Sequence, residues 1–561
     1  MKKYTYNNIS VPPEIAYDAQ LQLIDPSLLA VIYKRGYHTT EEIKDFLLPD
    51  KSRIMRDYVM AGTEQAVRIL AAAISNGDHI VIYRDYDCDG ISAGAIAMEC
   101  LSGLGAHVNH YANQRGIDGY GMCSAGVNNI LAKWPDTRVI LTVDNGISAF
   151  EGVRHAKDLG LTVIVTDHHE TSGSLPDADV VIDPKQPGEI YGFAHLCGAG
   201  VIFKLMLALY AHMGKHIAPV MDTLDIVSLA TVADVVPLIG ENRSLVKFGL
   251  EKNNEAARPF FAAMLAKSEL KNLNAHYGIS FLLAPMVNSV SRLDMDTDFV
   301  VEMMLSKDMI WLSDMADKLI ALNEHRKEIT KSELELVESC LTDQVSERDS
   351  AVIVRCDQLT EGIIGILAGR LKQQYNRPCI VFTMNDAGQL KGSARGCDGF
   401  ELKSALDNIP KGILLAYGGH AKAAGLTLLP EQYDSFCSEF RKLTDTAFAG
   451  SDYVESIEID EVLREQNCTK AFIHDLQYLE PFGEGFRAPL FGLIANVVDT
   501  KYMGVEQQHV KYITESGISV IQWNRGEAAK ARRSPPRKFV GVPSLNVWRD
   551  IVSVQFICDG E

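Results

Sequence analysis

Short runs of apolar, mostly β-branched residues recur along the first third of the chain, and most of them stop at a polar cluster. Such runs are typical of strands buried on both faces of a sheet. They predict strands at residues 80–83, 108–111, 138–143, 161–166 and 178–182. The segments between and after them predict helices at residues 62–75, 91–104, 124–133, 150–159, 196–212, 222–232 and 243–252. Because strands and helices alternate, we expect an α/β domain built on a parallel sheet.

The pattern changes further along the chain. Residues 296–342 are polar and helical with few turn signals, which indicates a connector between domains. Residues 351–443 predict a second, smaller α/β unit, and short alternating runs after residue 490 predict a small β-barrel. We therefore expect five parts, at residues 1–60, 61–295, 296–345, 346–450 and 451–561.

Composition narrows the class of protein. The chain has 561 residues, 47% of them hydrophobic, so several buried cores can form. No apolar run is long enough to span a membrane, and no apolar stretch follows the basic start MKKYTYNNIS, so we expect no membrane span and no signal peptide. Eleven cysteines without a CxxC pair suit reduced thiols in a cytoplasm. The net charge of −19 argues weakly against a nucleic-acid partner, although basic residues cluster locally.

Three aspartates directly follow the first predicted strand. If the extended backbone continues, Asp85, Asp87 and Asp89 point to one side, at the end of a parallel sheet where ligands bind. Neighbouring carboxylates repel one another, so the array favours a bound cation, with a solvated acidic turn as the alternative. An EF-hand calcium loop does not fit, because Ile96 stands at the twelfth position, where that loop needs a glutamate.

Further ligand-type residues follow the next strands. Asp144 comes after one strand, and Asp167, His168 and His169 come after another, so we expect these side chains to converge. Asp234 lies in an apolar run and needs a metal, an ion pair or a helix-capping role. Carboxylates with one or two imidazoles suit Mg²⁺ or Mn²⁺, and their number suggests two ions sharing an aspartate, an arrangement that hydrolyses phosphoesters.

Four motifs, in this order, carry a resemblance to a known family. They are DYDCDG at residues 85–90, DNGIS at 144–148, DHHE at 167–170 and TVADVVPLIGENR at 231–243. Together they resemble the DHH phosphoesterase superfamily and, within it, the RecJ family of single-strand-specific 5′→3′ DNA exonucleases. The similarity extends from residue 28 to residue 550. It implies a DHH domain, a DHHA1 domain facing it across a cleft, and a C-terminal OB-fold.

The resemblance implies a role for each residue of the metal site. The expected metal ligands are Asp85, Asp87, Asp89, Asp144, His168 and Asp234. Asp144 would bridge two divalent ions, Mn²⁺ or Mg²⁺, with the first two aspartates on one ion and the remaining three ligands on the other. His169 would donate to the scissile phosphate, with support of the loop as its alternative role, and Asp167 would orient His168.

The resemblance also implies contacts to the substrate. Asn288 and Arg292, in PMVNSVSRLD, would contact phosphate, and Arg115 would help to hold the 5′-terminal phosphate. Ser393 and Arg395, in KGSAR, would form the other anchor of that phosphate. Guanidinium groups and a hydroxyl suit a terminal phosphate dianion, and surface ion pairing is the alternative role for each arginine.

A glycine-rich segment resembles part of the DHHA1 domain. In it, Gly418, Gly419 and His420 would bind substrate, since glycines let the backbone approach a nucleotide closely, and a purely structural turn is the alternative. The chain departs from the family pattern at Arg84, Ser291 and Thr360. The sequence leaves open whether Arg84 pairs with a carboxylate or meets a phosphate.

The last domain offers candidate residues for binding single strands. OB-folds stack bases on aromatic side chains along a basic groove. Phe491, Trp523 and Trp548 are the candidates, and for at least one of them we favour core packing. Residues 525–538 are rich in lysine and arginine and suit a phosphate track, with a solvated loop as the alternative.

The expected function is a metal-dependent exonuclease that releases nucleotides from the 5′ end of single-stranded DNA in recombination and repair. Two alternatives stay open: a DHH phosphoesterase acting on short oligonucleotides, cyclic dinucleotides or polyphosphate, and a catalytically inactive DNA-binding scaffold. A scaffold would be expected to lack metal ligands, and all the expected ligands are present here. We expect a cytoplasmic monomer without membrane contact, with a single-stranded-DNA-binding protein and a helicase as candidate partners.

Overall fold

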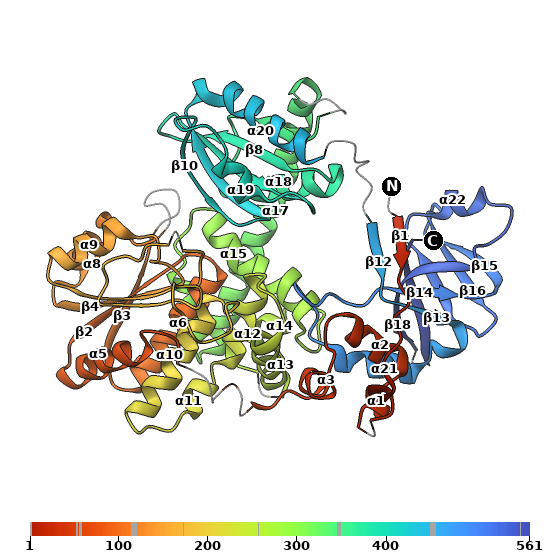
Figure 1. Ribbon diagram of the computed structural model, residues 1–561, viewed down its shortest axis with the longest axis horizontal. Helices are drawn as coiled ribbons and strands as arrows, with labels where there is room; N and C mark the ends of the chain where they lie inside the picture. The colour runs from red at the N-terminus through yellow and green to blue at the C-terminus, as the bar shows by residue number, and fades with distance from the viewer. Residues whose placement is uncertain are drawn as a thin grey trace. The chain divides into compact units, whose positions relative to one another are not determined.

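The computed structural model describes residues 3–18, 20–51, 54, 59–113, 121–171, 173–255, 257–344, 349–448, 456–549 and 551–560. The chain divides into two compact units (Figure 1). The larger unit is Ser52–Tyr453, and the smaller unit combines Met1–Lys51 with Val454–Glu561. None of the described helices is both long enough and apolar enough to cross a lipid bilayer.

A five-stranded parallel sheet forms the centre of residues 61–295, the expected DHH domain, which we call the DHH part of the larger unit. Its strands are β2 (His79–Arg84), β3 (His107–Ala112), β4 (Thr137–Val143), β5 (Thr162–Thr166) and β6 (Val180–Ile182). They pair in the order β3-β2-β4-β5-β6. The chain moves from β2 outward to β3 and then returns to β4 on the other side of β2. Ligands of open α/β sheets bind at such a switch point, beyond the carboxyl ends of the strands.

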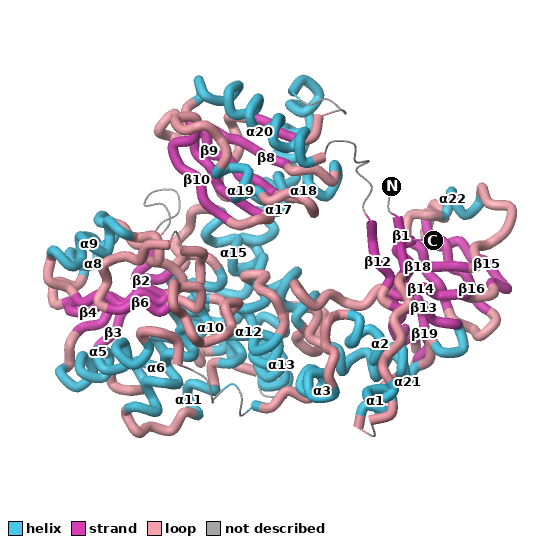
Figure 2. The backbone as a smooth tube through the Cα atoms, in the orientation of Figure 1, coloured by secondary structure: helices cyan, strands magenta, loops and turns pink. Residues whose placement is uncertain are grey.

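Helices cover both faces of this sheet because its central strand is apolar on both sides. Ile80 and Ile82 of β2 belong to one hydrophobic core, whereas Val81 and Tyr83 belong to another. The first core contains helices α5 (Thr63–Asn76), α6 (Cys88–Gly103) and α10 (Gly198–His212), and the second contains α8 (Ser124–Lys133) and α9 (Phe150–Asp158). Figure 2 shows these helices around the strands. The predicted parallel α/β domain is confirmed.

A helical region extends the first core. It consists of α11 (Ala218–Met221), α12 (Leu224–Ala233), α13 (Gly240–Glu255), α14 (Pro259–Ala266), the π-helix η2 (Ala275–Leu283), α15 (Ala284–Arg292) and α16 (Asp298–Leu305). The predicted connector contains α16 and the 36-residue helix α17 (Met309–Gln344).

The DHHA1 part has a second, mixed sheet. Its strands are β7 (Val352–Arg355), β8 (Cys379–Met384), β9 (Leu390–Arg395), β10 (Leu414–Gly419) and β11 (Ala423–Leu428), in the order β10-β11-β9-β8-β7. Only β7 and β8 pair in parallel. The helices are α18 (Ile364–Tyr375), α19 (Leu402–Asp407) and α20 (Tyr433–Ala447).

The smaller unit contains a seven-stranded sheet. The strand order is β13 (Glu461–Arg464), β14 (Phe491–Ile494), β18 (Lys538–Trp548), β19 (Ile551–Gly560), β17 (Ser519–Gln522), β16 (His509–Thr514) and β15 (Val497–Met503). The other elements are β1 (Lys3–Tyr6), α1 (Pro13–Ala16), α2 (Pro26–Lys34), α3 (Thr40–Leu47), β12 (Ser456–Ile459), α21 (Lys470–Leu476) and α22 (Gly526–Lys530).

The N-terminal segment and the C-terminal domain share one core. β1 pairs in parallel with β12, far away in the sequence. The Arg35 guanidinium donates to both carboxylate oxygens of Asp460, each at 2.9 Å, and the ring centroids of Phe46 and Phe486 are 4.6 Å apart. The sequence did not predict this partnership, since residues 1–60 were expected to form a separate part.

The three predicted stacking residues of the C-terminal domain have different surroundings. Phe491 is fully buried and packs edge-on against Phe472, so its assignment as a stacking candidate is wrong and core packing is its role. Trp523 is 52% exposed and lies against the ring of His509. The side chain of Trp548 lies outside the described residues. Within the basic run, Lys530 pairs with Glu527 at 2.8 Å.

Candidate metal centre

The opening aspartates lie at the junction between β2 and α6. The strand ends one residue before Asp85, and the helix begins one residue after Asp87, so Asp89 lies in the first helical turn. The Asp87 carboxylate caps the helix by accepting from the backbone N–H groups of Asp89 and Gly90, at 2.9 and 3.1 Å. The predicted alternation along an extended strand is therefore wrong, because an N-cap aspartate starts a helix here.

The expected metal ligands nevertheless gather in two adjoining sets. Within each set, one ligand atom per residue lies within 4.8 Å of the others; the first set is Asp85, Asp87 and Asp144, and the second is Asp89, His168 and Asp234. The Nε2 atom of His168 is 3.1 Å from Asp144 Oδ1. It is also 3.7 and 3.6 Å from carboxylate oxygens of Asp89 and Asp234. Asp144, a member of the first set, thus also lies against a member of the second.

The backbone around Asp144 is shaped for close approach. Asp144 has a φ of 61°, in the left-handed region that residues with a Cβ rarely adopt. A Cβ placed on Gly198 would lie 2.5 Å from the Asp144 Cβ, so only glycine allows α10 to begin at this distance. The N–H groups of Gly198 and Ala199 donate to Asp89 at 2.6 and 2.8 Å. The start of α10 therefore positions two expected ligands.

Burial sets the protonation of these groups when no cation is bound. Burial and the nearby Asp87 raise the pKa of Asp89 to about 6. Burial and the other aspartates also raise the pKa values of Asp144 and Asp234 well above the ordinary range. Burial lowers the pKa of His168, and among the described residues neither of its ring nitrogens has a hydrogen-bond partner. Crowded carboxylates beside a neutral imidazole fit divalent cations.

His169 is held by Asp167. The Nδ1 atom of His169 lies 2.7 Å from Asp167 Oδ1, whereas the His168 ring has no such contact with Asp167. The ring that Asp167 orients is therefore that of His169 and not, as expected, that of His168, which contacts Asp167 only through its backbone N–H at 2.7 Å. Burial opposes the charge of His169, but the hydrogen bond and charge of Asp167 raise its pKa to about 9. Despite burial, the bond to His169 lowers the pKa of Asp167 to about 2.

A cavity of about 1040 Å³ lies beside this pair, between the DHH and DHHA1 parts. Its lining includes His169, Gly418, Gly419 and His420. The rings of His169 and His420 are nearly parallel, with centroids 6.2 Å apart. Gly419 has a φ of 138°, and a Cβ there would lie 2.4 Å from the Ala423 carbonyl oxygen. The backbone conformation and the close contact therefore both require glycine at this position. The structure thus brings His169 together with the glycine-rich segment.

Four of the five other residues predicted to contact phosphate lie outside the lining of this cavity. Arg395 Nη1 donates to Ser393 Oγ at 3.2 Å on β9, but neither residue lines the cavity. Asn288 Oδ1 accepts from the N–H of Cys88 at 2.9 Å and so braces the opening motif. Arg292 Nη1 donates to the Gly362 carbonyl at 3.2 Å, across to the DHHA1 part. Arg115 lies outside the described residues.

The three departures from the family pattern have local explanations. Arg84 is fully buried and pairs with a carboxylate: its Nη2 atom is 2.5 Å from Asp298 Oδ1. Thr360 donates its hydroxyl to Glu333 at 2.7 Å. Ser291 is buried, with its hydroxyl 3.4 Å from the carbonyl oxygen of Asn288.

Sequence reasoning missed one buried acid near the centre. Asp183 is fully buried directly after β6, and its Oδ1 atom accepts from the Lys185 N–H at 2.7 Å. Burial raises its pKa to about 7. Asp144 was predicted because it is an aspartate directly after a parallel strand. The same pattern holds for Asp183 and could have identified it.

The fold and this carboxylate–imidazole centre define a DHH-type protein. Three family models match the chain: the N-terminal domain of the DHH family at residues 79–231, the DHHA1 domain at 348–445 and the RecJ OB domain at 459–560. The chain belongs to the RecJ family. It is 33% identical to the single-stranded-DNA-specific exonuclease RecJ of Dickeya dadantii, over 89% of this chain and 88% of that protein.

Further relatives and solved structures support membership of the RecJ family. RecJ of Bacillus subtilis is 32% identical over 94% of this chain, which spans 66% of that longer protein. Among solved structures, RecJ of Thermus thermophilus in complex with Mn²⁺ superposes with a TM-score of 0.83 and 25% identity, covering 99% of this chain and 79% of that one. An exonuclease RecJ bound to manganese gives a TM-score of 0.58 and 28% identity, covering 70% and 96%. The predicted combination of DHH, DHHA1 and OB domains is confirmed.

Proposed function

We propose that this chain is a 5′→3′ exonuclease specific for single-stranded DNA, acting in recombination and repair. The observation that carries the proposal is the pair of adjoining ligand sets that meet at Asp144, which suits two divalent ions. The names of the relatives support the substrate, and the manganese complex of the Thermus protein supports Mn²⁺, with Mg²⁺ as the alternative ion.

The residues present fit such ions. Asp85, Asp87 and Asp144 would hold one ion, and Asp89, His168 and Asp234 would hold the other, with Asp144 shared. The raised pKa values of the buried aspartates indicate that burial and mutual repulsion disfavour their charged forms when no cation is bound. Divalent ions held there would lower the pKa of water and offset the charge of a phosphodiester.

The chain's own side chains have distinct proposed tasks. Because Asp167 holds the Nδ1 side of the His169 ring, Nε2 is the atom of His169 that can donate to a phosphate oxygen. Asn288 and Arg292 would act beside it, the first by fixing the opening motif and both by meeting phosphate. Gly418, Gly419 and His420 would form the facing wall of the cavity. Ser393 and Arg395, with Arg115, would anchor the 5′-terminal phosphate.

The proposed tasks follow the expected division of the chain. Residues 61–295 would carry catalysis, 346–450 would hold the strand's 5′ end, and 451–561 would capture single strands, using Trp523 and the basic run 525–538. We propose that the protein acts as a cytoplasmic monomer. A single-stranded-DNA-binding protein and a helicase are proposed partners, because both generate or present single strands.

The test compares single strands labelled at the 5′ or the 3′ end, with Mn²⁺, Mg²⁺ or EDTA. We expect immediate release of mononucleotide from the 5′ label by the parent protein, and loss of this release with EDTA or in Asp144→Ala. The matched control is Asp158→Ala, which removes an exposed carboxylate from α9 of the same domain. It should retain full activity.

Other outcomes would redirect the proposal. Mononucleotide release from the 3′ label would overturn the polarity. Cleavage of dinucleotides or polyphosphate alone would leave the metal centre and remove the long-DNA substrate. If the protein binds single strands but does not cleave them, whichever metal is added, it is a catalytically inactive DNA-binding scaffold.

A further inference from the structure

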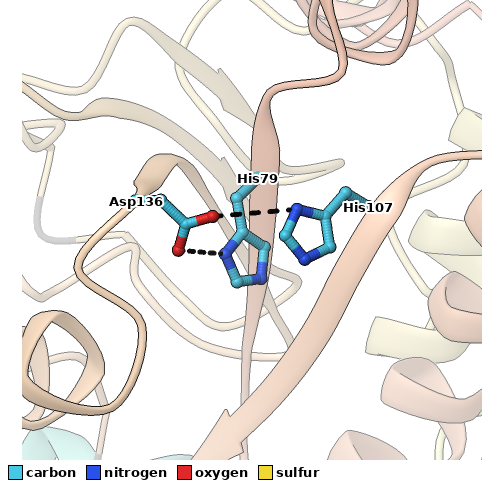
Figure 3. Close-up of side chains that lie close together, drawn as sticks. All are labelled: His79, His107 and Asp136. Carbon is cyan, nitrogen blue, oxygen red and sulfur yellow. Dashed lines mark hydrogen bonds and ion pairs between the residues drawn. The ribbon is translucent and has the colours of Figure 1, made fainter.

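Three ligand-type side chains meet at the opposite end of the DHH sheet. His79 and His107 are the first residues of β2 and β3, and Asp136 directly precedes β4. His79 is the cross-strand partner of His107 on one side and of Thr137 on the other. The register of three adjacent strands therefore fixes this juxtaposition (Figure 3). The six residues of β2 separate it from the candidate metal centre by about 20 Å.

The three side chains bring their ligand atoms close together. His79 Nδ1 is 3.1 Å from one Asp136 oxygen, and His107 Nδ1 is 3.9 Å from the other. The two rings stack with centroids 3.8 Å apart and planes 12° from parallel. Figure 3 shows the Nδ1 atoms of both rings turned toward the carboxylate. One ligand atom from each of the three residues lies within 4.8 Å of the others.

The second nitrogen of His79 indicates why a cation fits. His79 Nε2 is 2.9 Å from Asn109 Oδ1, so an N–H donated to Asn109 leaves a lone pair on Nδ1 that faces Asp136. A metal ion between the ring and the carboxylate would use that lone pair. The His79 side chain is only 1% exposed. A histidine that donates one N–H to a fixed acceptor and turns its other ring nitrogen toward a further ligand has the pattern that is usual for metal sites.

We propose that His79, His107 and Asp136 form a second metal site, which takes a transition-metal ion such as Zn²⁺, Co²⁺ or Ni²⁺. Two imidazoles and one carboxylate suit these ions, whereas the carboxylate-rich centre at the other end suits Mg²⁺ or Mn²⁺. The side chains of His107 and Asp136 are 53% and 64% exposed, so they can adjust and water can complete the coordination. A bound ion would fasten the amino ends of three adjacent strands. This site is independent of the proposed nuclease function.

The test measures Zn²⁺ bound per chain after equilibrium dialysis in excess Mg²⁺. The parent for comparison is Asp144→Ala, in which the candidate catalytic centre is impaired. We expect His107→Ala and Asp136→Asn, each added to this parent, to lose one equivalent of Zn²⁺. The matched control is His212→Ala, which removes another exposed histidine of the same domain. It should bind as much Zn²⁺ as the parent.

A second readout uses a nearby fluorophore. The Trp134 ring lies edge-on to His79 with centroids 6.1 Å apart, so Co²⁺ bound at this site should quench Trp134 fluorescence. The quenching should disappear in Trp134→Phe and in His107→Ala, while melting temperatures in EDTA show that the variants fold. Equal Zn²⁺ binding in the parent, His107→Ala and Asp136→Asn would overturn the proposal and leave an ordinary hydrogen-bonded histidine pair.

Discussion

The Asp167–His169 pair leads to a prediction about the pKa of His169. Asn at position 167 keeps an acceptor oxygen but removes the negative charge that helps to hold the pKa of His169 at about 9. In Asp167→Asn without metal, we therefore expect that pKa to fall toward the ordinary value of about 6.5, so that His169 is mostly neutral at about pH 8. Histidine NMR titration in EDTA measures the shift. A pKa that does not fall in the variant would contradict the pairing.

Gly198 gives a second prediction for one residue. A methyl group there would overlap the Asp144 side chain, so Gly198→Ala should displace the aspartate or the start of α10. We expect it to destabilise the fold by about 1–3 kcal/mol and to lower nuclease activity more than tenfold. Urea unfolding and a nuclease assay measure the two effects.

A matched glycine controls for helix propensity. Gly369 lies within α18, where an added Cβ would meet no atom within 4 Å. Gly369→Ala should therefore stabilise the chain by up to about 1 kcal/mol and leave activity unchanged. If both substitutions had the same effect, the close approach at Asp144 would have no special role.

Single residues also show what the sequence can predict about the site. The metal-site residues could be predicted because each is an acid or a histidine near a strand end or in an apolar run. Their geometry could not, because the capping by Asp87 and the pairing of Asp167 with His169 depend on loop conformation. Asn288 shows the same limit, since its contact with Cys88 joins residues 200 positions apart.

At the scale of elements, an ion pair joins β2 to α16, with a buried guanidinium and a carboxylate that is 36% exposed. Arg84 is fully buried and donates to Asp298, to the Thr297 hydroxyl at 2.9 Å and to the Asp85 carbonyl at 3.2 Å. Asp298→Ala would leave the guanidinium buried without its carboxylate, so we expect a loss of about 3 kcal/mol in the free energy of unfolding.

Urea unfolding of the variant tests this loss against an exposed pair. Lys267 and Asp317 join α14 to α17 with side chains 30% and 60% exposed. Asp317→Ala should lower the free energy of unfolding by less than about 1 kcal/mol. Equal losses in the two variants would mean that the Arg84 pair does not depend on burial.

Strand prediction succeeded where apolar runs were uninterrupted. The run at 138–143 was predicted within one residue of β4 (Thr137–Val143), because its β-branched residues are bounded by polar ones. In contrast, the alternating runs recognised in the C-terminal domain, at residues 490–497, 509–514, 519–523 and 552–558, did not include β18 (Lys538–Trp548). Gly541 and Pro543 interrupt its apolar pattern, and both residues are unfavourable signals for a strand.

At the scale of the whole molecule, metal binding should be linked to pH. Without a cation, the folded protein keeps protons on Asp89, whose pKa is about 6, at pH values where the unfolded chain has released them. The metal-free protein should therefore lose stability as pH rises from about 4 to above 6. Divalent ions would replace those protons, so the melting-temperature increase caused by Mn²⁺ should be larger at about pH 7.5 than at about pH 5.

Thermal melting with Mn²⁺ or EDTA at several pH values measures this linkage. Asp144→Ala serves as the comparison, because it removes the carboxylate of the first ligand set that also lies 3.1 Å from His168 of the second. Its Mn²⁺ response should be small at every pH. A Mn²⁺ shift in the parent that does not change with pH would contradict the assignment of the buried aspartates as ligands.

The division of the whole molecule was the least predictable feature. Thr39 and Glu42 form a capping box at the start of α3, a local signal that the sequence carries. Nothing local in that helix indicates that Phe46 packs against Phe486, because a hydrophobic face does not specify which distant surface will cover it.

The pairing of β1 with β12 has a consequence during protein synthesis. The first 51 residues leave the ribosome long before their partner segment, which begins at Val454. At a translation rate of about 5–20 residues per second, the roughly 400 intervening residues take about 20–80 s to synthesise. The nascent chain must keep the apolar faces of α2 and α3 from aggregating during that interval, so chaperones that shield early segments should strongly affect the yield of native protein.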